Sequence, residues 1–122
     1  MGIRSFMEIK AWQVARLLVQ RIYRSTSQWP YRYRALADQI NRSSVSVMAN
    51  IAEGFDSASD SDFIRYLVYS RQSTSEVQSH LVVAKDQSLM GEEEFTSLFR
   101  DTDQVKAMVI SFIQYLKKNP KH

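Results

Sequence analysis

Few side chains in this sequence have a type and spacing that would support catalysis. The chain of 122 residues has no cysteine and two histidines, His80 and the C-terminal His122. Glu76 precedes His80 by four residues, which places both side chains on one face of a helix. A di-iron bundle needs Glu-x-x-His pairs on two helices and two further inward glutamates, so the spacing and the number of ligands both fail. We interpret the pair as a contact at a helix surface or an interface.

The serines and glycines also lack the context that enzyme chemistry requires. Ser43, Ser44 and Ser46 have no neighbouring base that would activate a nucleophile, and we interpret them as small residues that allow close helix approach. Phosphate-binding and nucleophile-elbow motifs rich in glycine do not occur in the sequence. The sequence therefore predicts a protein that is not an enzyme and that uses no cofactor or metal.

Basic residues are concentrated in the first half of the chain. The net charge is +3, but residues 1–50 hold eight Lys/Arg against Glu8 and Asp38, a net charge of +6. A basic half is typical of a polyanion-binding surface, although it can equally pair with an acidic helix of the same bundle or of a neighbour. The candidate phosphate contacts, called the basic set below, are Lys10, Arg16, Arg21, Arg24, Arg32, Arg34 and Arg42.

Aromatic rings alternate with arginines directly after the first helical pattern. The order is Tyr31-Arg32-Tyr33-Arg34, preceded by Trp29. Such interleaving can stack on unpaired bases. Aromatic packing at a bundle end or at an interface is, however, the more common role of such an aromatic-rich connector.

Four helices must position these side chains, because apolar residues recur at spacings of three and four over four segments. The third segment is the longest, with an alternating seam from Phe63 to Ala84. Gly54 and Gly91 are placed where the second and third helices would end as C-caps. The predicted helices span residues 7–25, 34–53, 60–90 and 92–118.

Short connections between such helices make each one antiparallel to the next. We therefore expect an all-α, antiparallel up-down-up-down four-helix bundle that forms a single domain over residues 1–122. No stretch approaches 18 consecutive apolar residues, and the N-terminus lacks the pattern of a secretion signal. These features predict a cytoplasmic protein without a membrane partner.

Some apolar residues lie away from the predicted core. Leu17 falls among polar residues of the first helix, and Val45, Ala49 and Ala52 fall on the far side of the second. Isolated exposed apolar residues are common. Because two helices share the feature, we favour an oligomer interface formed by these four residues.

The run Asn50-Ile51-Ala52-Glu53-Gly54-Phe55, called the signature below, resembles that of a four-helix-bundle family. This family includes proteins encoded by intervening sequences in bacterial 23S ribosomal RNA genes. Further resemblance lies in Ala11-Trp12-Gln13 and in Phe63-Ile64-Arg65-Tyr66-Leu67, and His80 and Asp56 depart from the pattern. The resemblance implies a homopentamer related to the accessory protein of diversity-generating retroelements, a basic pentamer that binds nucleic acid and a reverse transcriptase.

The signature has a structural explanation that needs no catalysis. Asn50 and Glu53 would hydrogen-bond neighbouring helix ends, Gly54 would stop the helix at positive φ, and Phe55 would pack back. Arg65 would be the natural partner of Glu53 across the loop.

These observations lead to three functional hypotheses. The favoured one is a non-enzymatic homo-oligomer that binds RNA or single-stranded DNA through the basic set. The alternative is a protein–protein scaffold whose basic face meets an acidic protein partner. A metal or hydrolytic enzyme at Glu53, Glu76 and His80 is a distant third.

Overall fold

Four long helices follow one another in a computed structural model that describes residues 2–120, so His122 lies outside the described residues. They are α1 (Lys10–Thr26), α2 (Arg34–Phe55), α3 (Asp60–Asp86) and α4 (Glu92–Lys118). Two short 3-10 turns, η1 (Phe6–Glu8) and η2 (Tyr31–Tyr33), precede α1 and α2. Within residues 2–120 there is no strand, and no helix is both long and apolar enough to cross a membrane.

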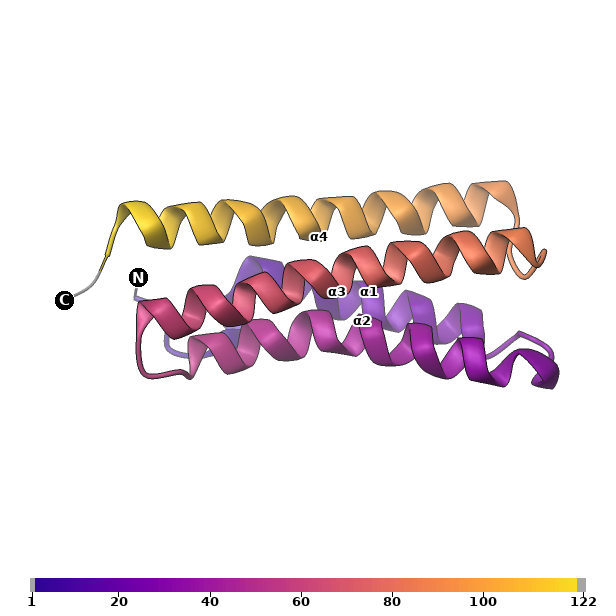
Figure 1. Cartoon of the computed structure of the whole chain (residues 1–122), viewed down its shortest axis with the longest axis horizontal. Coiled ribbons are helices and arrows are strands. Elements are labelled where there is room, and N and C mark those ends of the chain that lie inside the picture. The colour runs from indigo at the N-terminus through magenta and orange to yellow at the C-terminus, as the bar shows by residue number, and fades with distance from the viewer. Residues whose placement is uncertain (1, 121–122) are drawn as a thin grey trace.

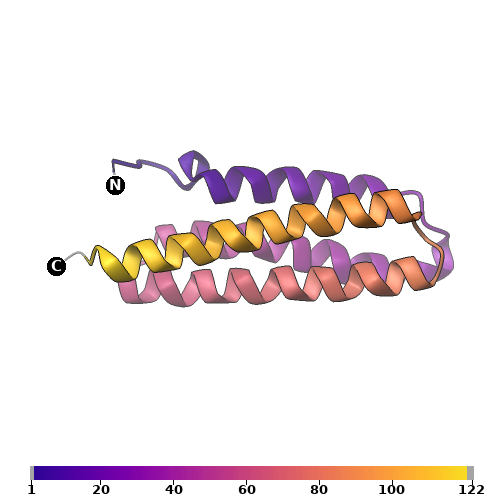
Figure 2. The same cartoon turned by 90° about the horizontal axis from the view of Figure 1, so that it is seen from above.

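Each helix is antiparallel to the next along the chain (Figures 1 and 2). α1 contacts α2 and α4, and α3 contacts α2 and α4, which closes the four helices into one bundle. Both ends of the described chain lie at one end of the bundle, beside the α2–α3 loop. The α1–α2 and α3–α4 connections lie together at the opposite end. The predicted all-α four-helix bundle is confirmed.

The core consists of the apolar seams that the spacing predicts. Residues of α3 from Phe63 to Ala84 on the predicted seam are all buried. The largest fully buried side chains come from all four helices: Leu18, Ile22, Ile40, Val47, Ile51, Leu67, Val77, Leu81, Leu98, Val105, Val109 and Leu116.

Small hydroxyl residues line the contact between α2 and α3. Ser43, Ser44 and Ser70 are buried, and the Ser70 Oγ donates a hydrogen bond to the Val47 carbonyl at 2.7 Å. The Ser46 and Ser73 hydroxyls lie 2.9 Å apart across the same contact. Side chains this small leave room for a close approach of the two backbones, the role expected for Ser46, whereas Ser43 and Ser44 donate to carbonyls of their own helix.

Helix boundaries differ from prediction by two residues or more at three places. α1 begins at Lys10 because Ser5 and Glu8 form a capping box around η1, and Ile9 is extended between η1 and α1. α2 continues through Gly54 to Phe55. α3 ends at Asp86 instead of residue 90, since Ser88 takes a φ of 59° and the Leu89 N–H bonds back to the Ala84 carbonyl at 2.9 Å. Gly91 is therefore the N-cap of α4 and not the C-cap of α3.

Candidate nucleic-acid interface

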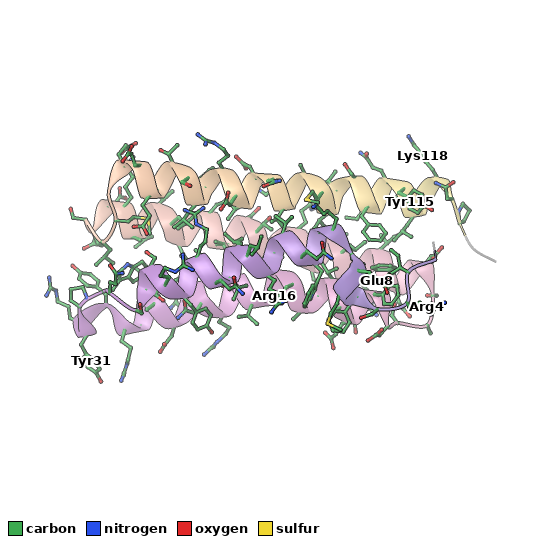
Figure 3. The ribbon with its side chains drawn as sticks, turned by 180° about the vertical axis from the view of Figure 1, so that it is seen from behind. Arg4, Glu8, Arg16, Tyr31, Tyr115 and Lys118 are labelled. Carbon is green, nitrogen blue, oxygen red and sulfur yellow. The ribbon has the colours of Figure 1, made fainter. Side chains whose placement is uncertain are left out.

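The basic set lies on α1, η2 and α2, and six of its seven side chains are exposed. α1 carries four basic residues and no acidic one. Arg16 projects from the outer surface of α1, and Tyr31 marks the bundle end where η2 lies (Figure 3). The exposed members are Lys10, Arg16, Arg24, Arg32, Arg34 and Arg42.

Arg21 differs from the rest of the set. Its guanidinium forms an ion pair with Asp101 of α4 and donates a hydrogen bond to the Ser97 hydroxyl at 3.1 Å. The side chain is 35% exposed. Arg21 therefore links α1 to α4. For this residue, the alternative of pairing with an acidic helix of the same bundle applies.

The six exposed members form no ion pair with an acidic side chain of residues 2–120. Several of them lie over aromatic rings instead. Arg16 lies 5.9 Å from the ring centre of Trp12. Such a contact leaves the charge of the guanidinium in place and keeps N–H donors free for a phosphate.

The segment from Tyr31 to Arg34 brings its rings and guanidinium groups together in pairs. Arg34 lies 4.8 Å from the centre of the Tyr31 ring and donates to the Tyr31 hydroxyl at 2.5 Å. Arg32 lies 4.9 Å from the centre of the Tyr33 ring. Tyr31 is 76% exposed, so one aromatic surface of this segment faces solvent.

The four candidate interface residues do not all have the same exposure. Leu17 is 59% exposed and Val45 is 37% exposed. Ala49 is exposed as well, whereas Ala52 is half-buried and packs against the core. Leu17, Val45 and Ala49 are thus available to a second chain, and Ala52 contributes mainly within the bundle.

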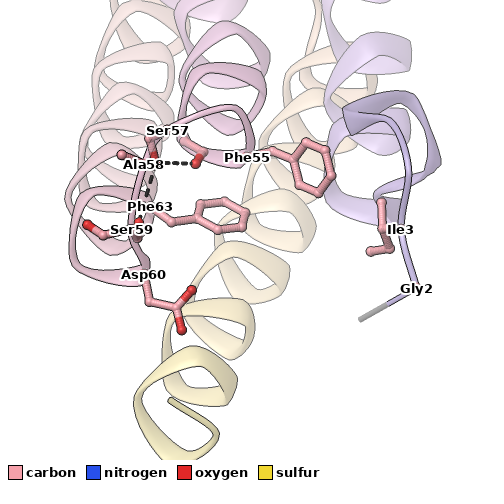
Figure 4. A pocket seen from close by; sticks show the side chains of 9 residues that line it. Gly2, Ile3, Phe55, Ser57, Ala58, Ser59, Asp60 and Phe63 are labelled. Carbon is pink, nitrogen blue, oxygen red and sulfur yellow. Dashed lines mark hydrogen bonds between the residues drawn. The ribbon is translucent and has the colours of Figure 1, made fainter. Parts of the chain in front are cut away.

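Gly54 is required for a reason other than the one predicted. It lies within α2 without a positive φ, and a Cβ placed on it would be 2.7 Å from the Phe63 Cδ1 and 3.0 Å from the Tyr66 Cβ. The Ser57 hydroxyl donates to the Gly54 carbonyl at 2.5 Å (Figure 4). The prediction of a helix stop at positive φ was wrong, and close approach of α3 explains the glycine.

The other signature residues have local roles. Asn50 donates to the Ser46 carbonyl at 2.8 Å, within its own helix, so it does not bond a neighbouring helix end as predicted. Phe55 packs edge-on to Phe63, with ring centres 6.2 Å apart, beside an open hollow of about 250 Å³ (Figure 4).

Arg65 does not pair with Glu53, and that prediction was also wrong. Its guanidinium bonds Asp62 one turn away at 3.1 Å and lies 4.9 Å from the centre of the Tyr66 ring. Tyr69, and after it Asp62, raise the pKa of Arg65 above its ordinary value. The Glu53 side chain is exposed and forms no ion pair within the described part of the chain.

The third functional hypothesis fails on geometry. The His80 Nε2 lies 3.9 Å from Glu76 Oε2, which is too long for a hydrogen bond, and this buried nitrogen has no hydrogen-bond partner in the described part of the chain. Glu53 lies beside the α2–α3 loop, roughly four turns from Glu76 along α3. The three residues form no common site, and residues 2–120 hold no group of three His, Asp or Glu suited to a metal ion.

The model of the 23S rRNA-intervening sequence protein family matches residues 7–111, which include the signature and the whole basic set. The chain belongs to this family. A comparison with the curated proteins found no match for this family member.

One solved structure similar to this family member is that of a protein of unknown function from the S23 ribosomal protein family of Bacteroides thetaiotaomicron. The two share 23% sequence identity with a TM-score of 0.80, over 85% of this chain and 95% of that chain. At this identity the likeness concerns the fold.

The sequence did not point to one polar cluster of this 23S rRNA-intervening sequence family member. Buried Gln78 of α3 donates to Thr102 at 2.9 Å and to Asp103 at 2.7 Å, and it accepts from Lys106 at 2.9 Å. The only sequence feature that could have indicated this cluster is the position of the polar residue Gln78 directly after the seam residue Val77. Because the side-chain amide of Gln78 is fully bonded within the bundle, the cluster fixes the contact of α3 with α4.

Proposed function

We propose that this protein is a cytoplasmic, non-enzymatic homo-oligomer that binds RNA or single-stranded DNA through the basic set. One observation carries the proposal: six exposed basic side chains of α1, η2 and α2 have no acidic partner within residues 2–120. Unpaired surface cations attract a polyanion over a distance of about 10 Å at 0.1 M salt. Arg21 acts in the bundle and contributes less to binding.

Binding of this kind is tolerant of sequence. Phosphate contacts by lysine and arginine carry no base information, and the exposed ring of Tyr31 offers a stacking surface that every base can use. Affinity then depends strongly on salt, because each phosphate contact releases a bound counterion.

We further propose that the assembly is a pentamer, held by Leu17, Val45 and Ala49. The resemblance to the accessory protein of diversity-generating retroelements supports this number. In a closed ring each subunit repeats the same basic surface, so modest contacts act together on one long strand. The same resemblance makes a reverse transcriptase, or another protein, a further candidate partner.

Filter binding with single-stranded RNA at several salt concentrations tests the proposal. We expect binding at 50 mM salt that falls roughly a thousandfold or more by 200 mM, as ~6 to 10 phosphate contacts require. Arg16→Glu with Arg24→Glu should weaken binding to all sequences about equally.

Arg100→Glu with Lys117→Glu is the matched control, because it changes the net charge equally on the exposed surface of α4. This control should retain most of the binding. Absence of binding at 50 mM salt, or equal losses in the two double variants, would refute the proposal.

A scaffold function is the second candidate, and it too has an observation in its favour. The exposed side chains of Met7 and Leu17 border an open hollow of about 420 Å³ on α1, with Trp12 in its wall. Apolar surface among basic residues suits an acidic amphipathic helix of a protein partner. This function is favoured if the filter-binding experiment shows no affinity for nucleic acid.

A further inference from the structure

An open hollow of about 400 Å³ lies at the bundle end where η2 meets the α3–α4 connection. This end is opposite the two ends of the described chain (Figure 1). The residues that matter here are Trp29, Arg32, Tyr33, Gln87, Ser88 and Glu94, which come from both connections and from the first turn of α4. The hollow therefore has walls from three separate segments.

Flat groups form one side of the hollow. Trp29 and Tyr33 are both half-buried, and the Arg32 guanidinium lies 4.9 Å from the centre of the Tyr33 ring. Indole rings and guanidinium planes are the surfaces on which proteins stack unpaired bases. A planar aromatic ligand thus suits this side of the hollow.

One unsatisfied N–H donor and one exposed carboxylate accompany these flat groups. The Trp29 Nε1 is buried without a hydrogen-bond partner among residues 2–120, a state that is unfavourable for an N–H donor. The Glu94 carboxylate is exposed and forms no ion pair within residues 2–120. The hollow thus combines a carboxylate acceptor with an arginine that keeps its positive charge.

The backbone at the hollow is held in an uncommon conformation. Ser88 has a φ of 59°, where glycine is the usual residue after a helix. Its exposed side chain and that of Gln87 add polar groups to the wall. A glycine would avoid the strain, but it would leave no hydroxyl at this point.

We propose that this hollow binds the guanine base of an unpaired nucleotide, a proposal that rests on the proposed function. Guanine carries two adjacent N–H donors on its Watson–Crick edge, and one carboxylate can accept both. The corresponding edges of adenine, cytosine and uracil do not offer this pair of donors, so Glu94 selects guanine. Trp29 and Arg32 supply stacking, and the charge of Arg32 suits the phosphate. One position of a bound strand is then read, while the basic set holds the rest without preference.

Isothermal titration with GMP and AMP tests the hollow without any oligonucleotide. GMP should bind about tenfold or more tightly than AMP. Glu94→Gln should bring the two affinities together. Glu93→Gln makes the same charge change one residue away, outside the hollow, and should keep the preference. Trp29→Phe keeps a ring and removes the unsatisfied N–H, so it should weaken both ligands less than Trp29→Leu.

Filter binding of an oligo-uridine with one central guanine, against the same strand with a central adenine, separates the two proposals. If both strands bind equally and GMP shows no preference, the guanine site is wrong and the general nucleic-acid function stands. If GMP is preferred but neither strand binds at 50 mM salt, the site is correct and the general function is wrong. Equal GMP preference in the Glu94→Gln and Glu93→Gln variants would overturn the role of Glu94.

Discussion

The backbone at Gly54 lies directly against α3, and this contact explains why the position has no side chain. A Cβ there would be 2.7 Å from the ring of Phe63, a distance that real Cβ atoms do not show. Because φ is ordinary, alanine would otherwise be favoured in the helix by about 1 kcal/mol. The packing term and the helix-propensity term therefore have opposite signs.

We expect Gly54→Ala to destabilise the fold by about 1–2 kcal/mol, because overpacking against Phe63 and Tyr66 outweighs the gain in helix propensity. Urea denaturation measures the change. Gly91→Ser is the control, because a Cβ added at Gly91 would have no described atom within 4 Å. Gly91 is also the N-cap of α4, a position where serine is favoured. The control should be neutral or stabilising.

A double-mutant cycle shows whether Phe63 is the cause. The cost of Gly54→Ala should fall in a Phe63→Leu background, because the smaller side chain leaves room for the new Cβ. Equal costs in the two backgrounds would point to another explanation for Gly54.

At this scale the sequence predicted which residues matter better than it predicted why. The structural interpretation of the signature required only that Gly54 precede an aromatic residue and a loop. The position of the Phe63 ring depends on how α3 crosses α2, and no local pattern specifies that. For the same reason Arg65 could be assigned to Glu53, when it pairs with Asp62 in its own helix.

Among the helices, α3 shows what the spacing of apolar residues can predict and what it cannot. Its alternating seam predicted the buried face from Phe63 to Ala84 correctly, because side-chain direction follows from the helix repeat. Its end was placed four residues late. Sequence reasoning relied on Gly91 as the stop, whereas Ser88 takes the left-handed conformation without being a glycine.

Replacing Ser88 by glycine should stabilise the fold by about 1 kcal/mol, because the left-handed conformation then carries no Cβ penalty. Gln87→Gly is the matched control at a φ of −87° and should destabilise by about 0.5–1 kcal/mol. Thermal unfolding of both variants provides the comparison. A Ser88→Gly variant less stable than the parent would show that the serine side chain outweighs the strain.

Pairing between helices was the part of the element scale that could not be predicted. The excess of acidic residues in the second half allowed many partners for the arginines of α1. Asp101 is the acidic partner of Arg21 because the rotation of α4 about its own axis turns Asp101 toward α1. That rotation follows from the packing of the whole core.

For the whole molecule, the proposed oligomer depends on the outward side chains of α1 and α2. We expect sedimentation equilibrium at tens of micromolar to show a closed oligomer, and Ala49→Arg to dissociate it, because a buried unpaired charge is costly. Ala107→Arg makes the same change at an exposed alanine of α4 and should leave the assembly intact. A monomeric parent protein would end this proposal.

The four-helix topology was predictable because it follows from helix number and short connections. The contact between α1 and α4 closes the bundle and joins the two helices that are most distant in sequence. No sequence motif predicts this contact. The hollow at the η2 end was also beyond prediction, since its walls come from residues near 30 and near 90.

An even number of helices has a practical consequence for handling the protein. Both ends of the described chain lie at the end of the bundle that carries the α2–α3 loop (Figure 2). α3 and α4 each have 27 residues, so this end is about 40 Å from the hollow beside Trp29. A purification tag or fluorescent label on either terminus leaves the hollow uncovered. A molecule immobilised through a terminus on a sensor surface therefore presents the Trp29 end outward to ligands in the flow.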